Sequence, residues 1–255
     1  MTRGLGSYSG THARIAVVFH CYYIDMVRTV SYRLSKFPFV FDLYITTPAD
    51  QVALALEHEI VPIEQVLKCE ITITPNVGRN FGPFLIEYGK KLGEYDLLCH
   101  VHTKKSQHTS SFSGWGEYLL ENIIGSPNLV TTIVKFFERN LRCGLVYPVR
   151  FPEIPKWSQH WLGNFVVCEN WCRRNGVSIT PGFLEFPTGG MFWARPVALR
   201  QLLSYDWTYE EFPPEAGQID GTMHHAIERL IGAITSQNNF LLFGFDPDKY
   251  EFYEL

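Results

Sequence analysis

The sequence predicts an α/β protein with a mostly parallel central sheet flanked by helices. Apolar runs of strand length alternate with segments of helical periodicity through residues 14–102. That alternation is typical of βαβ units, which bring consecutive strands together in parallel. The 255-residue chain is 46% hydrophobic, so it can bury a large core, and no repeat or linker interrupts it. We therefore expect a single domain over residues 14–245, after a poorly ordered polar leader at residues 1–13.

The first half of the chain supplies four expected strands, at residues 14–20, 39–47, 69–74 and 95–102. Helical periodicity follows the first three, in residues 25–37, in a short helix after Pro48 and in residues 84–92. Asp25 is expected to be the N-cap of the first helix. The carboxyl ends of parallel strands share one edge of the sheet, where ligands of α/β proteins gather.

The second half is less regular. Residues 115–140 predict two helices that break near residues 125–127, and residues 143–149 predict a fifth strand. Residues 150–180 are expected to form a loop around one aromatic helix. A strand at residues 189–196 then enters a helix, and a late helix occupies residues 221–234.

Composition excludes several classes of protein. A formal net charge of -4 argues against a protein that coats nucleic acid, because such binding needs a basic surface. No apolar run approaches the ~18 residues of a membrane span, and the N-terminus lacks the apolar stretch of a signal peptide. The six cysteines are scattered, which indicates reduced thiols rather than a disulfide framework. We expect a cytoplasmic protein.

The stretch "TPNVGRNFGPF" at residues 74–84 joins the third strand to a helix and is a candidate anion-binding turn. Its glycines permit positive φ or close backbone approach, and its arginine can bind a phosphate through two parallel hydrogen bonds. Its amides lie where the sheet presents ligands. A tight structural turn with one solvated arginine is the alternative, and spacing alone does not decide. The candidate substrate-binding residues are Asn76, Gly78, Arg79, Asn80 and Gly82.

A second polar cluster, "HVHTKKSQH", ends the fourth strand beside this turn. His102, Lys104 and Lys105 are candidate substrate-binding residues, because two ammonium groups beside Arg79 could neutralise a diphosphate without a metal. His100 and His102 share a face of the strand, but a metal there needs a third ligand, and only His108 is near in sequence. Hydrogen-bonded core histidines are the alternative.

The third cluster lies in "FPTGGMFWARPVAL" and "EEFPPEAGQIDGTMHHAIERL". Asp220 precedes the late helix and is either its N-cap or a general base that takes a proton from a sugar hydroxyl. Glu228 and Arg229 suit a solvated helix face as well as they suit a functional role. Further candidate substrate-binding residues are Gly189, Gly190, Glu215 and Gln218.

The order of "NVGRNFGPF", "HTKKS", "W..YLLENIIGS", "FPTGGMFWARP" and "FPPEAGQIDGTMHHAIERL" resembles the rhamnan synthesis protein F family. The resemblance implies a glycosyltransferase of cell-surface polysaccharide assembly, with a nucleotide-diphosphate sugar, dTDP-L-rhamnose, as donor. It implies a glycan or lipid-linked glycan as acceptor. It also implies a cytoplasmic location at the inner face of the plasma membrane, with peripheral membrane association.

The chain is also similar to GT-A glycosyltransferases, which bind nucleotide sugars on a Rossmann-like fold. Members show an Asn-x-Gly stretch, an Asp-x-Asp that holds a metal, a glycine pair and an acidic residue that heads a helix. The matching residues here are Asn76, Gly78, Asn80, Gly82, Gly189, Gly190 and Asp220. Where Asp-x-Asp is expected, the chain has His102, Thr103 and Lys104. That departure counts against a divalent metal, Mg²⁺ or Mn²⁺, and no metal ligand is assigned.

Three functions stay open at this level. The first is a glycosyltransferase in which Arg79, Lys104 and Lys105 hold the donor diphosphate and Asp220 is the base. The second is a non-catalytic carbohydrate-binding or assembly module that keeps the glycosyltransferase fold. The third is a metal-dependent hydrolase built on His100 and His102.

Overall fold

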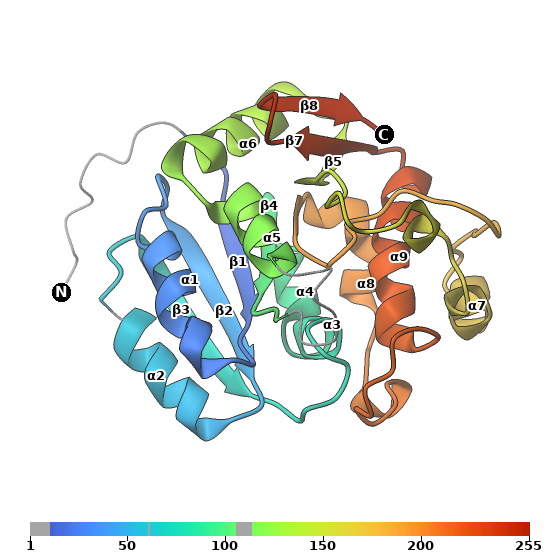
Figure 1. The fold of residues 1–255 in the computed structure, drawn as a ribbon, viewed down its shortest axis with the longest axis horizontal. Coiled ribbons are helices and arrows are strands. Elements are labelled where there is room, and N and C mark those ends of the chain that lie inside the picture. Colours follow the sequence, from blue (N-terminus) through green and yellow to red (C-terminus); the bar gives the residue numbers. More distant parts are fainter. Residues whose placement is uncertain (1–10, 61, 106–113) are drawn as a thin grey trace.

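A computed structural model describes residues 11–60, 62–105 and 114–255 of the chain. One eight-stranded sheet runs through the molecule in the order β3-β2-β1-β4-β6-β5-β7-β8 (Figure 1). The strands are β1 (Ile15–His20), β2 (Phe41–Thr47), β3 (Val66–Ile73), β4 (Leu97–His102), β5 (Cys143–Pro148), β6 (Phe192–Ala194), β7 (Leu241–Asp246) and β8 (Glu251–Glu254).

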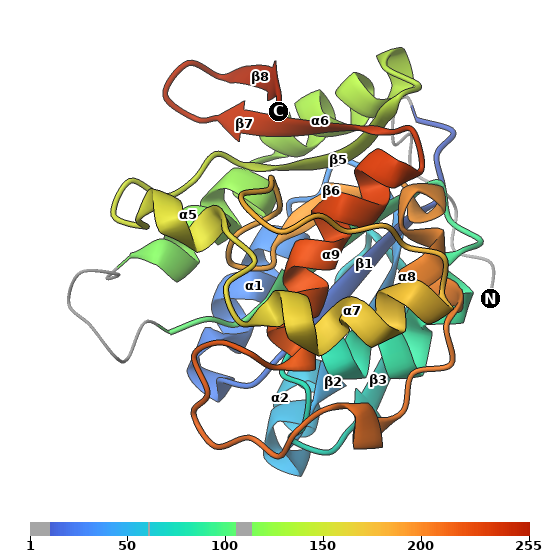
Figure 2. The ribbon, with the colours of Figure 1, turned by 90° about the vertical axis from the view of Figure 1, so that its right-hand side faces the viewer.

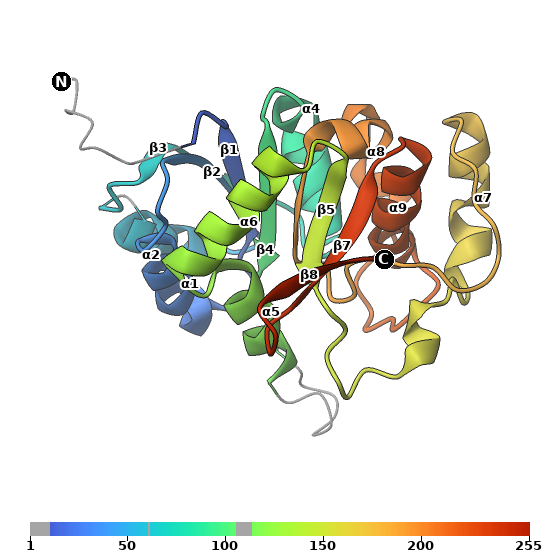
Figure 3. The same ribbon diagram turned by 90° about the horizontal axis from the view of Figure 1, so that it is seen from above.

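Helices cover both faces of the sheet (Figure 3). The first face carries α1 (Val27–Leu34), α2 (Asp50–Ile60), α5 (Trp115–Ile124) and α6 (Pro127–Arg139). The second carries α3 (Phe81–Pro83), α4 (Gly89–Leu92), α7 (Asn164–Arg174), α8 (Arg200–Ser204) and α9 (Met223–Gln237). Figure 2 shows this second face, where α7 packs beside α9.

The alternation of side chains along the strands explains why both faces are covered. In β1, Ile15, Val17 and Phe19 pack toward α1 and α2, whereas Ala16 and Val18 pack toward the opposite helices. Successive side chains of a strand point to opposite faces. A strand that is apolar at every position is therefore buried on both sides, as the sequence predicts for a strand of a parallel block.

The prediction of a mostly parallel sheet is wrong. The pairs β3–β2, β2–β1 and β1–β4 are parallel, as expected from the βαβ pattern, and β5 pairs with β7 in parallel. However, β6 is antiparallel to both β4 and β5, and β7 and β8 form an antiparallel hairpin. The glycine pair delivers the chain to β6 at the end of the sheet where β4 finishes, so β6 must run back along β4. The sheet is therefore mixed.

Local signals fix several helix boundaries. The break between α5 and α6 lies where the sequence predicts it, because the Ser126 hydroxyl accepts a hydrogen bond from the Leu129 amide and Pro127 begins α6. Asp25 is not the N-cap of α1. It lies inside a 3-10 turn (Ile24–Met26) that precedes that helix, so its carboxylate is free to bind elsewhere.

The state of the cysteines and the character of the helices bear on the environment of the chain. All six cysteines are free thiols, and only Cys69 is exposed. In the described parts of the chain, none of the helices combines the length and the apolar character that crossing a membrane requires.

Candidate functional site

Three cationic side chains meet at the carboxyl edge of the parallel strands. Arg79 follows β3, and Lys104 and Lys105 follow β4. Burial lowers the pKa of the Lys104 ammonium group, the Glu228 carboxylate opposes this shift, and the charge of Arg79 adds to it. The Tyr23 phenol, whose pKa is raised mainly by burial, feels the charges of both Lys105 and Arg79. The structure therefore brings the predicted cations together.

The turn before α3 is shaped by its two glycines. Gly78 has φ +77°, and a Cβ there would lie 2.8 Å from the Gly82 Cα. A Cβ on Gly82 would lie 3.0 Å from the Val77 carbonyl oxygen, and the Phe212 ring packs against both glycines. Arg79 itself has φ 53°, a left-handed conformation that is uncommon for a residue other than glycine. The turn is thus compact and presents Arg79 away from the core, while Asn76 stays exposed.

Arg79 contacts the loop that precedes α9. Its Nε and one Nη donate to the two oxygens of Glu215, each at 3.1 Å, and the same Nη donates to the Gln218 carbonyl at 2.5 Å. This pairing holds the pKa of the Glu215 carboxyl below its ordinary value. The other Nη lies 3.1 Å from Nε2 of His225. Because arginine only donates, Nε2 is the acceptor, and the His225 proton sits on Nδ1, 2.8 Å from the Thr222 hydroxyl.

The two lysines also have partners within the chain. Lys105 donates to the Asp25 carboxylate and lies over the Tyr23 ring, 4.9 Å from its centroid. Lys104 lies over the Trp115 ring at 3.9 Å and is within electrostatic reach of Glu228. Aromatic faces and carboxylates both stabilise a nearby ammonium group. The edge of the sheet is therefore an interleaved set of cations and carboxylates.

The glycine pair connects this edge to α9. The Gly189 amide donates to Oε1 of Glu228 at 2.7 Å, and its carbonyl oxygen lies 2.9 Å from Nε2 of His102. The Gly190 carbonyl oxygen lies 2.6 Å from Nδ1 of His100. A Cβ on Gly190 would meet the Asn80 side-chain amide at 3.2 Å. The pair is thus the junction of the turn, the end of β4 and α9.

The histidines at the strand ends are buried and neutral. Burial is the main reason that the pKa falls to about 3 for His20 and His100 and to about 4 for His102. His100 is stacked between the rings of Phe81 and Phe192. Within the described residues, no three His, Cys, Asp or Glu side chains are arranged to hold a metal ion. His108 lies outside the described residues. The side chains of the described residues therefore do not fit a metal site.

Asp220 lies two residues before the N-cap of α9, but its carboxylate binds the start of α7. Its oxygens accept hydrogen bonds from the Gly163 amide at 3.0 Å and from the Asn164 side chain at 2.5 Å. The N-cap of α9 is Thr222, so the N-cap interpretation of Asp220 is wrong for that helix. The Arg229 guanidinium is 3.9 Å from Asp220. Asp220 therefore ties the loop before α9 to the first turn of α7.

Sequence reasoning missed the buried face of α9. The solvated-face interpretation of Glu228 and Arg229 is wrong, because only 17% and 7% of their side chains are exposed. Arg229 donates to the His160 carbonyl at 2.9 Å and lies over the Phe186 ring. The stretch "HHAIERL" shows that His225, Glu228 and Arg229 share one helix face at i, i+3 and i+4, but not that another segment covers this face.

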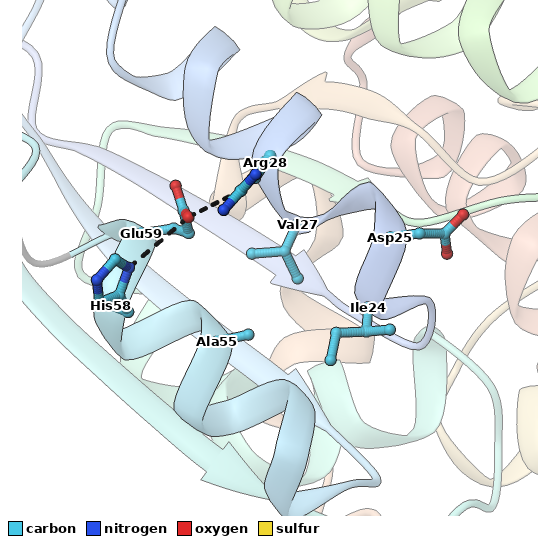
Figure 4. A pocket seen from close by; sticks show the side chains of 7 residues that line it. All are labelled: Ile24, Asp25, Val27, Arg28, Ala55, His58 and Glu59. Carbon is cyan, nitrogen blue, oxygen red and sulfur yellow. Dashed lines mark hydrogen bonds and ion pairs between the residues drawn. The ribbon is translucent and has the colours of Figure 1, made fainter.

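One hollow lies beside this site, and its lining includes Asp25, the partner of Lys105. It measures about 500 Å³ and opens between the start of α1 and the second half of α2 (Figure 4). Arg28 and Glu59 form an ion pair across it, and the Asp25 carboxylate points away from that pair. The lining residues are Ile24, Asp25, Val27, Arg28, Ala55, His58 and Glu59.

Fold and site define an α/β protein with interleaved cations and carboxylates at the edge of a parallel strand block. The chain belongs to the rhamnan synthesis protein F family, whose sequence model matches residues 4–240. This confirms the resemblance seen in the sequence, and the description of the family refers to the synthesis of a polysaccharide, rhamnan. It is also 31% identical over 217 residues to the uncharacterized protein WxcX of Xanthomonas campestris pv. campestris, in strains ATCC 33913 and B100. These matches cover 85% of this chain but 30% of each relative.

Proposed function

We propose that the chain is a glycosyltransferase that moves a sugar, with L-rhamnose favoured, from a nucleotide-diphosphate donor to a growing cell-surface polysaccharide. The observation that carries this proposal is the convergence of Arg79, Lys104 and Lys105 at one edge of the sheet. Such cations neutralise the charge that develops on a leaving diphosphate. Membership of a family described by rhamnan synthesis supports dTDP-L-rhamnose as the donor.

The proposal extends to fold, acceptor and place of reaction. A GT-A-like arrangement is supported by the order of the turn, the strand end, the glycine pair and the acidic loop along the chain. The proposed acceptor is a glycan or lipid-linked glycan, met at the inner face of the plasma membrane. In this proposal Asn76, Asn80, Glu215 and Gln218 surround the donor, and Lys104 and Lys105 take the place of a metal.

Arg79→Ala is expected to weaken dTDP binding about 10–100-fold, because a charged hydrogen bond contributes about 1.5–3 kcal/mol. Titration calorimetry with dTDP and dTDP-L-rhamnose measures the effect. Arg28→Ala is the control, since Arg28 is an exposed arginine that pairs with Glu59 outside the site. An unchanged Kd, or a loss of folding stability as large as the loss of binding, returns Arg79 to the role of a structural residue.

Chelation provides a second test. If ammonium and guanidinium groups neutralise the diphosphate, EDTA is expected to leave the rate of rhamnosyl transfer unchanged. The assay follows transfer from dTDP-L-rhamnose to a glycan acceptor before and after chelation. Loss of transfer that added Mg²⁺ or Mn²⁺ restores would show that a metal, and not Lys104 and Lys105, provides the neutralising charge.

A non-catalytic carbohydrate-binding or assembly module is the second candidate. One observation favours it: each of the three cations already has a carboxylate within reach, namely Glu215, Glu228 or Asp25. A donor must then replace at least the Glu215 contact of Arg79. Binding of the polysaccharide without any binding of dTDP or dTDP-L-rhamnose would support this candidate over the enzyme.

A further inference from the structure

We propose that Glu228, on the buried face of α9, is the general base that accepts the proton of the acceptor hydroxyl. This inference rests on the proposed glycosyl transfer and assigns a residue that the sequence placed on a solvated surface. It concerns the one carboxylate that lies among the glycine pair, Lys104 and Arg229. Three observations support Glu228: the position of its carboxylate, an oxygen that accepts no hydrogen bond from the described residues, and the contacts that already hold Asp220.

The first observation is the position of the Glu228 carboxylate. Glu228 reaches from α9 to the glycine pair, where its Oε1 accepts the Gly189 amide hydrogen bond at 2.7 Å. It is within electrostatic reach of Lys104 and Arg79, two of the cations that would hold the donor diphosphate. A base for sugar transfer must lie near the anomeric carbon, which is bonded directly to that diphosphate. Glu228 is therefore on the correct side of the proposed donor.

The second observation concerns the other oxygen, Oε2. It forms an ion pair with the Arg229 Nη1 atom at 3.7 Å, and among the described residues no donor hydrogen-bonds to it. The hydrogen bond from the Gly189 amide to Oε1 holds the side chain in place. Oε2 therefore has a fixed orientation and can accept a proton. Burial raises the pKa of this carboxyl, against the opposing charges of Arg229 and Lys104. A raised pKa brings a carboxylate closer to the value that suits a base at neutral pH.

The third observation concerns Asp220, the base that the sequence predicts. Both of its oxygens are already used, by the Gly163 amide and by the Asn164 side chain. The Gly221 amide in turn donates to the Asn164 side-chain oxygen at 3.0 Å, which closes a reciprocal clamp between the loop and α7. The Asp220 carboxylate therefore serves to position the loop before α9. Among the described residues, Glu228 has one oxygen fixed by a hydrogen bond and one held only by the longer ion pair with Arg229, which suits proton transfer better.

The proposed step is a single displacement. The acceptor hydroxyl oxygen attacks the anomeric carbon as its proton passes to Oε2 of Glu228, and a new carbon–oxygen bond forms. The bond between the anomeric carbon and the diphosphate oxygen breaks, and its electron pair leaves with dTDP. Glu228 later returns the proton to water. A single displacement inverts the configuration at the anomeric carbon, so the geometry also commits the reaction to inversion.

Glu228→Gln is the decisive variant. The amide oxygen of glutamine can still accept from the Gly189 amide, so folding and dTDP affinity are expected to persist while the base is lost. We expect kcat to fall about 10²–10⁴-fold, the usual contribution of a general base. The acidic limb of the pH–rate profile should disappear with it. Glu59→Gln, a change on α2 outside the site, is the matched control and should keep the wild-type kcat.

Asp220→Asn separates the two carboxylates. It is expected to lower thermal stability, because it weakens the clamp to α7, and to keep most of kcat per folded molecule. Full activity of Glu228→Gln, or a large kcat loss confined to Asp220→Asn, overturns the assignment while the transferase proposal stands. A product with retained configuration also overturns it. If the wild type binds no dTDP-L-rhamnose and transfers no sugar, the proposed function fails and the inference fails with it.

Discussion

Between pH 6.5 and about pH 4.5 the protein is expected to lose much of its folding stability, because four buried histidines and the half-buried His225 must stay neutral in the folded state. Burial lowers the pKa to about 3 for His20, His100 and His224, and to about 4 for His102 and His225. In the unfolded chain these imidazoles take up protons near pH 6.5. The unfolded state therefore binds more protons in this window, and stability falls as the pH falls.

The size of the effect follows from linkage. Each histidine that is neutral when folded and charged when unfolded adds up to about 1.4 kcal/mol per pH unit. Over two pH units, two or three such histidines lower the free energy of unfolding by an amount comparable with the ~5–15 kcal/mol that stabilises an ordinary domain. Glu228 acts in the opposite direction, because its raised pKa favours protonation in the folded state. Urea unfolding midpoints measured across this pH range report the net slope.

His100→Asn identifies one contributor. An asparagine amide can take the place of Nδ1 and donate to the Gly190 carbonyl, but it does not titrate. The variant should be less stable at pH 7, because it leaves a space among Phe81, Phe84 and Phe192, and its stability should fall less steeply with acid. A flat stability profile between pH 6.5 and 4.5 in the wild type would contradict the burial of neutral histidines.

The pattern of strands and helices predicts the parallel half of the sheet well. In β1 to β4 every strand is followed by a helix or enters the site, and a parallel pair requires such crossovers. The direction of β6 relative to its neighbours β4 and β5 could not be predicted, because an apolar strand of three residues has no pattern that distinguishes parallel from antiparallel pairing. The β7–β8 hairpin was missed for a related reason. A short turn and not a helix joins β7 to β8, so the alternation of strands and helices does not predict this antiparallel pair.

The candidate site divides in a similar way. The turn with Arg79 and the strand end with Lys104 could be located because both leave parallel strands at the same edge. The buried face of α9 could not, because periodicity does not reveal what covers a helix. The covering segment is the irregular loop before α7, whose Ser158 and His160 carbonyls accept hydrogen bonds from Arg229. Irregular loops carry no period from which such contacts could be predicted.

The contribution of the glycine pair, Gly189 and Gly190, to folding stability can be tested by adding one methyl group to Gly189. Gly189→Ala is expected to cost about 2–5 kcal/mol of folding free energy, the sum of a left-handed backbone penalty and overpacking. Gly189 has φ +97°, and its new Cβ would lie 2.6 Å from the Leu119 Cδ1 atom and 2.9 Å from the Trp115 ring. Thermal and urea unfolding measure the loss.

Gly176→Ala is the matched control, because it separates backbone strain from crowding. Gly176 has φ +65°, and a Cβ there would meet nothing within 4 Å, so a cost of only about 1–2 kcal/mol is expected. The excess cost at Gly189 then measures how tightly the pair is packed against α5. In Gly189→Ala the amide and carbonyl of residue 189 must move away from Glu228 and His102. Turnover of dTDP-L-rhamnose by the folded Gly189→Ala protein should therefore fall. Equal costs at the two glycines would show that α5 yields to the methyl group and that the pair does not fix the site.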